Sequence, residues 1–140
     1  MADASRLRLL VWRAGALRCA APIERLREVL PAVPVTALPG APDAVCGVAN
    51  VRGTLVTVVD CRRLLGQADG FPPDATVLVD LGGRAVGLAV DAVEDLVEVA
   101  DSALTPRGSG PSLGWEVQLD EGSPARLLDL DQLLEPLFRD

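Results

Sequence analysis

Short apolar runs alternate with glycine, proline and charged residues along the whole chain. In several of these runs apolar and polar positions alternate, which is the period of a β-strand with one buried face. The runs are rich in β-branched valine, a residue that fits strands well. We therefore expect a mainly all-β fold with strands at residues 7–12, 16–21, 26–30, 45–51, 54–59, 76–81, 84–90, 96–100, 113–119 and 124–128.

Three short helical segments are expected between and after the strands. Pro22 suits the first turn of a helix at residues 23–25 because its φ angle is fixed. Asp60 can cap a short helix that runs to Leu65, and Asp129 can cap a closing amphipathic helix with an apolar leucine face. The remaining expectations are loops at 31–43 and 101–112, a link at 67–74, a turn or brief helix at 92–95 and a turn at 121–122.

The chain contains an internal repeat. Gly53, Asp60 and the leucine pair that follows are matched 69 residues later by Gly122, Asp129 and a second leucine pair. Residues 23–29 are echoed by residues 93–99 at an offset of 70. Two motifs in the same order at nearly the same offset indicate two similar β-rich halves, which suggests two small antiparallel barrels.

Each half is too short to bury a large core by itself. We therefore expect one domain over residues 1–140, in which halves at approximately 16–66 and 76–128 pack against each other. The N-terminal strand and the C-terminal helix are candidates for exchange between the two halves.

The predicted hairpin at residues 45–59 is the most informative segment. Gly53 permits a positive φ angle, so the chain can reverse there without a Cβ clash. Arg52 is left at the tip of the turn, with the donors of its guanidinium group pointing outward. The hairpin offers a rigidly held arginine and no catalytic group. This combination indicates a role in recognising a partner and not in catalysis.

The composition excludes several kinds of catalytic site. All 13 basic residues are arginine, and the chain has no histidine. A Walker lysine, a Schiff-base lysine, a histidine base and a histidine-ligated metal are therefore excluded, and we expect no cofactor. Cys19, Cys46 and Cys61 lack C-x-x-C spacing, so we expect free, mostly buried thiols. A small β-barrel enzyme that uses serine or cysteine is the remaining catalytic alternative, and we expect no enzyme.

The net charge of −7 is distributed unevenly, because residues 1–70 carry +3 and residues 71–140 carry −10. An acidic chain with few aromatic residues is a poor match for nucleic acid. No apolar run approaches the roughly 18 residues of a membrane span, and the N-terminus lacks the apolar core of a signal peptide. We therefore expect a cytoplasmic protein that does not insert into a membrane.

The most specific similarity to known proteins is the run Gly47-x-x-Asn50-x-Arg52-Gly53, followed by Val59-Asp60. Supporting motifs cover nearly the whole chain: Ile23-x-x-Leu26-x-Glu28-Val29, residues 38–42, Gly87-x-x-Val90-Asp91-x-Val93 and Leu127-Leu128-Asp129. In these motifs the chain resembles the CheW family of coupling proteins, the adaptors of bacterial chemosensory arrays. One departure is Thr57, where the family often has proline, although a strand tolerates threonine better.

The resemblance implies two intertwined five-stranded SH3-like barrels with short helices. It also implies an adaptor that joins chemoreceptor cytoplasmic tips to the regulatory domain of a CheA-type histidine kinase. The alternative is an accessory protein that binds receptors but not the kinase. By resemblance, the receptor-binding residues are Ile23, Leu26, Glu28, Asn50 and Arg52, while Gly47 and Gly53 occupy coupling and turn positions.

Each of these residues also has a purely structural interpretation. Arg52 can brace Asp60 or Glu28 in a surface ion pair worth less than about 1 kcal/mol. Ile23 and Leu26 can be ordinary core residues, and Glu28 an ordinary solvent-facing strand residue. Gly47 and Gly53 can be present because the backbone requires them.

Overall fold

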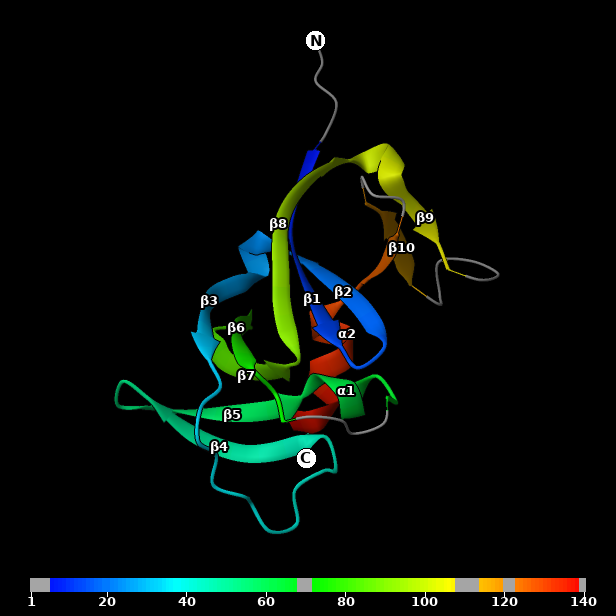
Figure 1. Ribbon diagram of the computed structural model, residues 1–140. Helices are drawn as coiled ribbons and strands as arrows, with labels where there is room; N and C mark the ends of the chain where they lie inside the picture. The colour runs from blue at the N-terminus through cyan, green and yellow to red at the C-terminus, as the bar shows by residue number, and fades with distance from the viewer. Residues whose placement is uncertain (1–5, 68–71, 108–113, 120–122, 139–140) are drawn as a thin grey trace.

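The computed structural model describes residues 6–67, 72–107, 114–119 and 123–138. Its strands form two sheets that pack against each other, with short helices beside them (Figure 1). The helical segments are η1 (Ile23–Arg25), α1 (Cys61–Leu64), η2 (Asp101–Ala103), α2 (Leu130–Leu134) and η4 (Glu135–Phe138). The mainly β fold expected from the alternating pattern is confirmed.

The five-stranded sheet comes from the middle of the chain and has the strand order β3-β6-β7-β5-β4. Its strands are β3 (Leu26–Pro31), β4 (Val45–Val51), β5 (Thr54–Asp60), β6 (Ala75–Leu81) and β7 (Arg84–Val90). All neighbours are antiparallel except β5 and β7, which are parallel. Consequently β3 and β4 are the two outer strands of this sheet.

The six-stranded sheet joins the two ends of the chain in the order β8-β1-β2-β11-β10-β9. Here the only parallel neighbours among the described strands are β11 and β2. The strands are β1 (Arg6–Ala14), β2 (Leu17–Pro22), β8 (Ala92–Ala100), β9 (Leu104–Pro106), β10 (Trp115–Gln118) and β11 (Pro124–Leu127).

The two sheets share one arrangement. The order β3-β6-β7-β5-β4 matches β8-β1-β2-β11-β10, including the position of the parallel pair. Each sheet takes one hairpin from the other half of the chain. The hairpin β6–β7 joins strands β3–β5 of the first half, and the hairpin β1–β2 joins strands β8–β11 of the second half. The whole N-terminal hairpin is therefore exchanged, and the sheets do not follow the expected boundaries at 16–66 and 76–128.

The main core lies between the two sheets. On β1, Trp12 faces this core, while Leu9 and Val11 face a second cluster within the six-stranded sheet. Leu88 on β7 and Leu134 on α2 reach the main core from the other elements. Both faces of the central strands are therefore buried, and the main core is shared by the two sheets.

Two local predictions differ from the structure. Residues 92–95 belong to β8, because this segment pairs with β1, and a register shift accommodates the extra residue. Unlike η1, it has no proline before it to fix a helical turn. The loop expected at 101–112 includes η2 and β9, which pairs with β10 and gives this sheet its sixth strand. The turn at 121–122 lies outside the described residues.

Candidate functional site

The β4–β5 hairpin has a two-residue turn. Val51 pairs with Thr54, which leaves Arg52 and Gly53 as the connection. Their φ angles of 50° and 87° are both positive, as in a type I′ turn. The side-chain oxygen of Asn50 accepts a hydrogen bond of 2.8 Å from the backbone N–H of Gly53. A positive φ is uncommon for a residue with a side chain, so the turn holds Arg52 in a constrained position.

Arg52 forms an ion pair with Glu28 on β3. Because β3 and β4 are the outer strands of the five-stranded sheet, this contact links its two edges. The hydrogen bond to Glu28 raises the pKa of Arg52, which therefore stays charged. The Arg52 side chain is still 65% exposed, and only its Nη2 group is used in this bond. The arginine thus braces Glu28 and also presents donors to solvent.

Gly47 has a different role from Gly53. Its φ is 148°, and it lies at a register shift between β4 and β5. A Cβ atom there would lie 2.9 Å from the Cα of Ala37 and still closer to the carbonyl of Thr36. Thr36 and Val48 form an isolated bridge at this point, so Gly47 permits the loop after β3 to lie against β4. A Cβ on Gly53 would meet no atom within 4 Å.

An exposed apolar residue lies beside the turn. Leu55 is 72% exposed and is the cross-strand partner of Asn50. Val29, next to Glu28 on β3, is also exposed. The sequence analysis missed Leu55, although the alternation of β5 could have placed it on the same face as Thr57. This apolar side chain and the charged Arg52–Glu28 pair belong to the same end of the five-stranded sheet.

Ile23 and Leu26 lie outside this contact. Ile23 begins η1 and is half-buried, and Leu26 begins β3 and packs against the main core. The structural interpretation of Leu26 therefore has direct support. A receptor-binding role for Ile23 and Leu26 stays a prediction, as it does for Glu28, Asn50 and Arg52.

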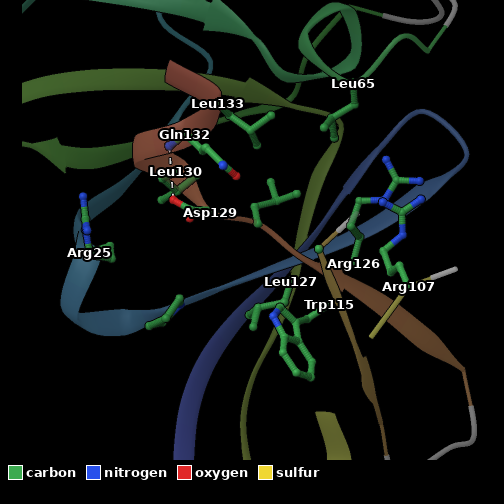
Figure 2. A pocket seen from close by; sticks show the side chains of 13 residues that line it. Arg25, Leu65, Arg107, Trp115, Arg126, Leu127, Asp129, Leu130, Gln132 and Leu133 are labelled. Atoms are coloured by element: carbon green, nitrogen blue, oxygen red, sulfur yellow. Dashed lines mark hydrogen bonds between the residues drawn. The ribbon is translucent and has the colours of Figure 1, made fainter. Parts of the chain in front are cut away.

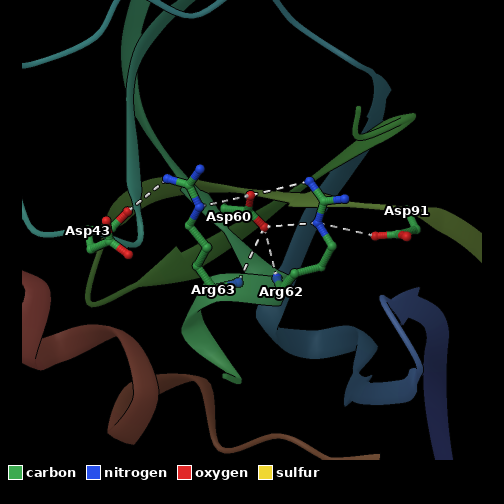
Figure 3. Close-up of polar contacts among 5 residues, drawn as sticks. All are labelled: Asp43, Asp60, Arg62, Arg63 and Asp91. Carbon is green, nitrogen blue, oxygen red and sulfur yellow. Dashed lines mark hydrogen bonds and ion pairs between the residues drawn. The ribbon is translucent and has the colours of Figure 1, made fainter. Parts of the chain in front are cut away.

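A largely buried ionic cluster joins the end of β5 and the start of α1 to the connection between β7 and β8 (Figure 3). Asp60 caps α1 by accepting the N–H of Arg62 at 2.9 Å, which confirms the predicted cap. The Arg62 side chain is 5% exposed, and its Nε lies 3.3 Å from Asp60 and 3.6 Å from Asp91. Asp91 lies between β7 and β8, where the chain crosses from one sheet to the other. The sequence analysis did not identify Arg62, because its spacing resembles that of any arginine early in a helix.

Three further features of the described residues concern metal ligands, cysteines and membrane-spanning helices. In this part of the chain, His, Cys, Asp and Glu side chains do not gather in threes as a metal site would require. Cys19, Cys46 and Cys61 form no disulfide with one another, as predicted. No helix among the described residues has the length and apolar character needed to cross a membrane.

Comparison with known proteins gives a consistent result. The family model described as the CheW-like domain matches residues 8–137. A chemotaxis protein CheW of Rhizobium meliloti is 35% identical over 100 residues, which are 70% of this chain and 64% of that protein. The protein FrzA of Myxococcus xanthus is 35% identical over 101 residues, or 69% of this chain and 63% of its own length.

The matched part of the chain thus spans slightly less than two thirds of these relatives. A solved structure, the scaffolding protein TtCheW of Thermoanaerobacter tengcongensis, superposes with a TM-score of 0.81 at 20% identity and covers 94% of both chains. That similarity supports the fold. The family match over nearly the whole length shows that the chain belongs to the CheW family.

Proposed function

We propose that this chain is a non-enzymatic adaptor that couples the cytoplasmic tips of chemoreceptors to a CheA-type histidine kinase. Membership of the CheW family supports the proposal, as do relatives named as chemotaxis proteins. The proposed partners are proteins, and the proposal involves no bond-making step, nucleic acid or membrane insertion.

The observation that carries the proposal is the constrained and exposed Arg52. Its left-handed backbone conformation costs roughly 1–2 kcal/mol, and its surface ion pair with Glu28 returns less than about 1 kcal/mol. Stability alone therefore does not account for an arginine at this turn. An exposed guanidinium on a constrained turn, in the same hairpin as the exposed Leu55, suits recognition, because an apolar anchor with a charged rim is typical of protein interfaces.

In the proposed complex, the helical hairpin of a receptor tip places its apolar face on the adaptor. Ile23 and Leu26 contribute their partly exposed apolar surface. Arg52 and Glu28 fix the register through charge pairing with the receptor, and Asn50 keeps the turn in position. Gly47 and Gly53 act through the backbone conformations that they permit.

The experiment is a pair of titrations of the whole chain, one with a receptor cytoplasmic tip and one with the kinase regulatory domain from the same genome. Binding to both partners is the expected result. Binding to the receptor alone would replace this proposal with the accessory adaptor, and binding to neither would refute it.

Arg52→Ala locates the receptor surface. Alanine has the same backbone cost as arginine in this turn, so the loss of stability should stay below about 1 kcal/mol, whereas receptor binding should weaken by about tenfold. Arg27→Ala is the matched control, since Arg27 is an exposed arginine that pairs with Asp80 on the same sheet. Equal effects of the two variants on receptor binding would contradict the assignment of Arg52.

A further inference from the structure

Two cysteines meet in the main core, where the two sheets pack together. Cys19 lies on β2 of the six-stranded sheet, and Cys61 begins α1, directly after β5 of the five-stranded sheet. Both side chains are fully buried in the same core cluster. A hydrogen bond joins their thiols. This contact therefore links elements of the two sheets that lie far apart in the sequence.

The third cysteine serves as an internal comparison. Cys46 on β4 is only partly buried and packs against a different cluster, which is formed by Ala49, Val58 and Ala89. A single buried cysteine commonly acts as a small apolar core residue. Two buried thiols in direct contact can also be joined covalently, because a disulfide requires its two sulfur atoms to be neighbours.

The hydrogen bond makes the two thiols chemically unequal. The sulfur of Cys61 accepts it, which lowers the pKa of Cys61 against the opposing effect of burial. The buried indole N–H of Trp12 acts in the same direction and has no other hydrogen-bond partner among the described residues. The same hydrogen bond and burial raise the pKa of Cys19. Cys61 is therefore the thiol that ionises first, and the thiolate is the reactive form of cysteine.

A cleft of about 600 Å³ brings solvent close to this pair (Figure 2). Leu65 lines the cleft and donates its backbone N–H to the carbonyl of Cys61 at 3.1 Å. Arg126 also lines it and is the cross-strand neighbour of Cys19 on β11. Leu128, a third lining residue, belongs to the core cluster that contains both cysteines. A small oxidant in the cleft therefore meets a wall built from the neighbours of the thiol pair.

We propose that Cys19 and Cys61 form a reversible disulfide in the presence of a hydroperoxide. With hydrogen peroxide, the Cys61 thiolate attacks one oxygen and the O–O bond breaks, which gives a sulfenic acid and a hydroxide that takes up the Cys61 proton as water. The sulfur of Cys19 then attacks the sulfenic sulfur, and its proton leaves with the hydroxyl group as a second water. The two thiols lose two electrons, and the peroxide is reduced to two water molecules.

The disulfide ties the N-terminal hairpin to the start of α1. It closes residues 19–61 into a loop and so lowers the entropy of the unfolded chain. The cross-link therefore holds the two sheets together more firmly than packing alone. Because both sulfurs are buried, the reaction with peroxide is slow, and bulky thiol reagents are excluded from the pair.

The whole chain is treated with hydrogen peroxide overnight, the remaining thiols are blocked, and the protein is digested with trypsin without reduction. Trypsin cleaves after arginine, so the three cysteines fall in the separate peptides 19–25, 28–52 and 53–62. Mass spectrometry should find 19–25 linked to 53–62. The oxidised protein should also unfold at a temperature about 5–15 °C higher, and dithiothreitol should reverse both changes. Absence of the linked peptide, or a lower unfolding temperature when it forms, would overturn the proposal.

Cys46→Ala is the matched control, because it removes the third thiol and should leave the linked peptide and the higher unfolding temperature unchanged. Cys61→Ala should abolish both. If Cys61→Ala does not fold, Cys19→Ala makes the same test from the other sulfur. A rise in unfolding temperature that survives in a folded variant of either Cys19 or Cys61, or that is lost in folded Cys46→Ala, would refute the assignment of this pair.

Discussion

Gly47→Ala should loosen the edge of the five-stranded sheet. The new methyl group would meet the backbone of Thr36 and Ala37, which are not the ends of flexible side chains. Thr36 and Val48 exchange two backbone hydrogen bonds of 2.8 and 2.9 Å at this point. Because neither backbone can move without lengthening these bonds, the loop before β4 should separate from the strand.

The structure allows the cost to be worked out. Losing two backbone hydrogen bonds costs about 2 kcal/mol in total. Placing alanine at a φ of 148° adds roughly 1–2 kcal/mol. The expected loss of about 3–4 kcal/mol is a large fraction of the 5–15 kcal/mol that typically stabilises a domain. Receptor binding should also weaken, because the same edge supports the Arg52 turn.

Urea unfolding measures the loss of stability, and hydrogen exchange at the amides of Thr36 and Val48 locates it. Gly53→Ala is the matched control, because its φ of 87° carries a backbone cost but its Cβ meets no atom within 4 Å. Gly53→Ala should therefore cost only roughly 1–2 kcal/mol and leave both amides protected. If the two variants lose equal stability, or if the Val48 amide keeps its protection in Gly47→Ala, the proposed clash is wrong.

Three further predictions follow from buried and paired groups. Arg62→Met should cost about 3 kcal/mol, because Asp91 loses its cation and Asp60 keeps only the more distant Arg63. Arg63→Met should cost less than about 1 kcal/mol, and equal unfolding free energies of the two variants would contradict the role of Arg62. The hydrogen bond from Arg25 lowers the pKa of Asp131, so this pair stabilises the fold above the ordinary aspartate pKa of about 4. That contribution is lost as the pH falls through the lower pKa of the folded state, and a stability difference between wild type and Arg25→Gln that stays constant in acid would refute it. A thiol reagent should modify Cys46 before Cys19 and Cys61, which are fully buried, and mass spectrometry that found Cys19 labelled first would contradict this order.

The local pattern of the sequence predicted most of the strands. Residues 45–51 and 84–90 form strands with the expected bounds, because each is rich in apolar residues and has a glycine-containing turn at one end, Arg52-Gly53 or Gly82-Gly83. The segment 92–95 was predicted wrongly because its conformation depends on pairing with β1, more than 75 residues earlier in the chain. The sequence analysis expected exchange of the N-terminal strand but not of whole hairpins, since a repeat reveals similar units but not which strands pair.

The site was predictable where it depends on turn chemistry. The Arg52-Gly53 dipeptide between two β-rich runs determined the position of the turn and the arginine at its tip. The exposed Leu55 and the cleft around Arg126 were not predictable, because they depend on which side chains remain uncovered after the sheets pack. Arg62 was missed because only the structure shows two carboxylates from distant parts of the chain, Asp60 and Asp91, around it.

The hairpin exchange limits how this protein can relay a signal. The two sheets share the main core, and the connection from β7 to β8 carries Asp91, which contacts the buried Arg62. Separating the sheets would expose that core, at a cost comparable to unfolding. A partner bound at the Arg52 turn therefore meets a surface whose position relative to the rest of the chain is fixed. Under the proposed function, a change in receptor packing would reach the kinase through movement of the whole adaptor as a rigid body, and not through opening of its two sheets.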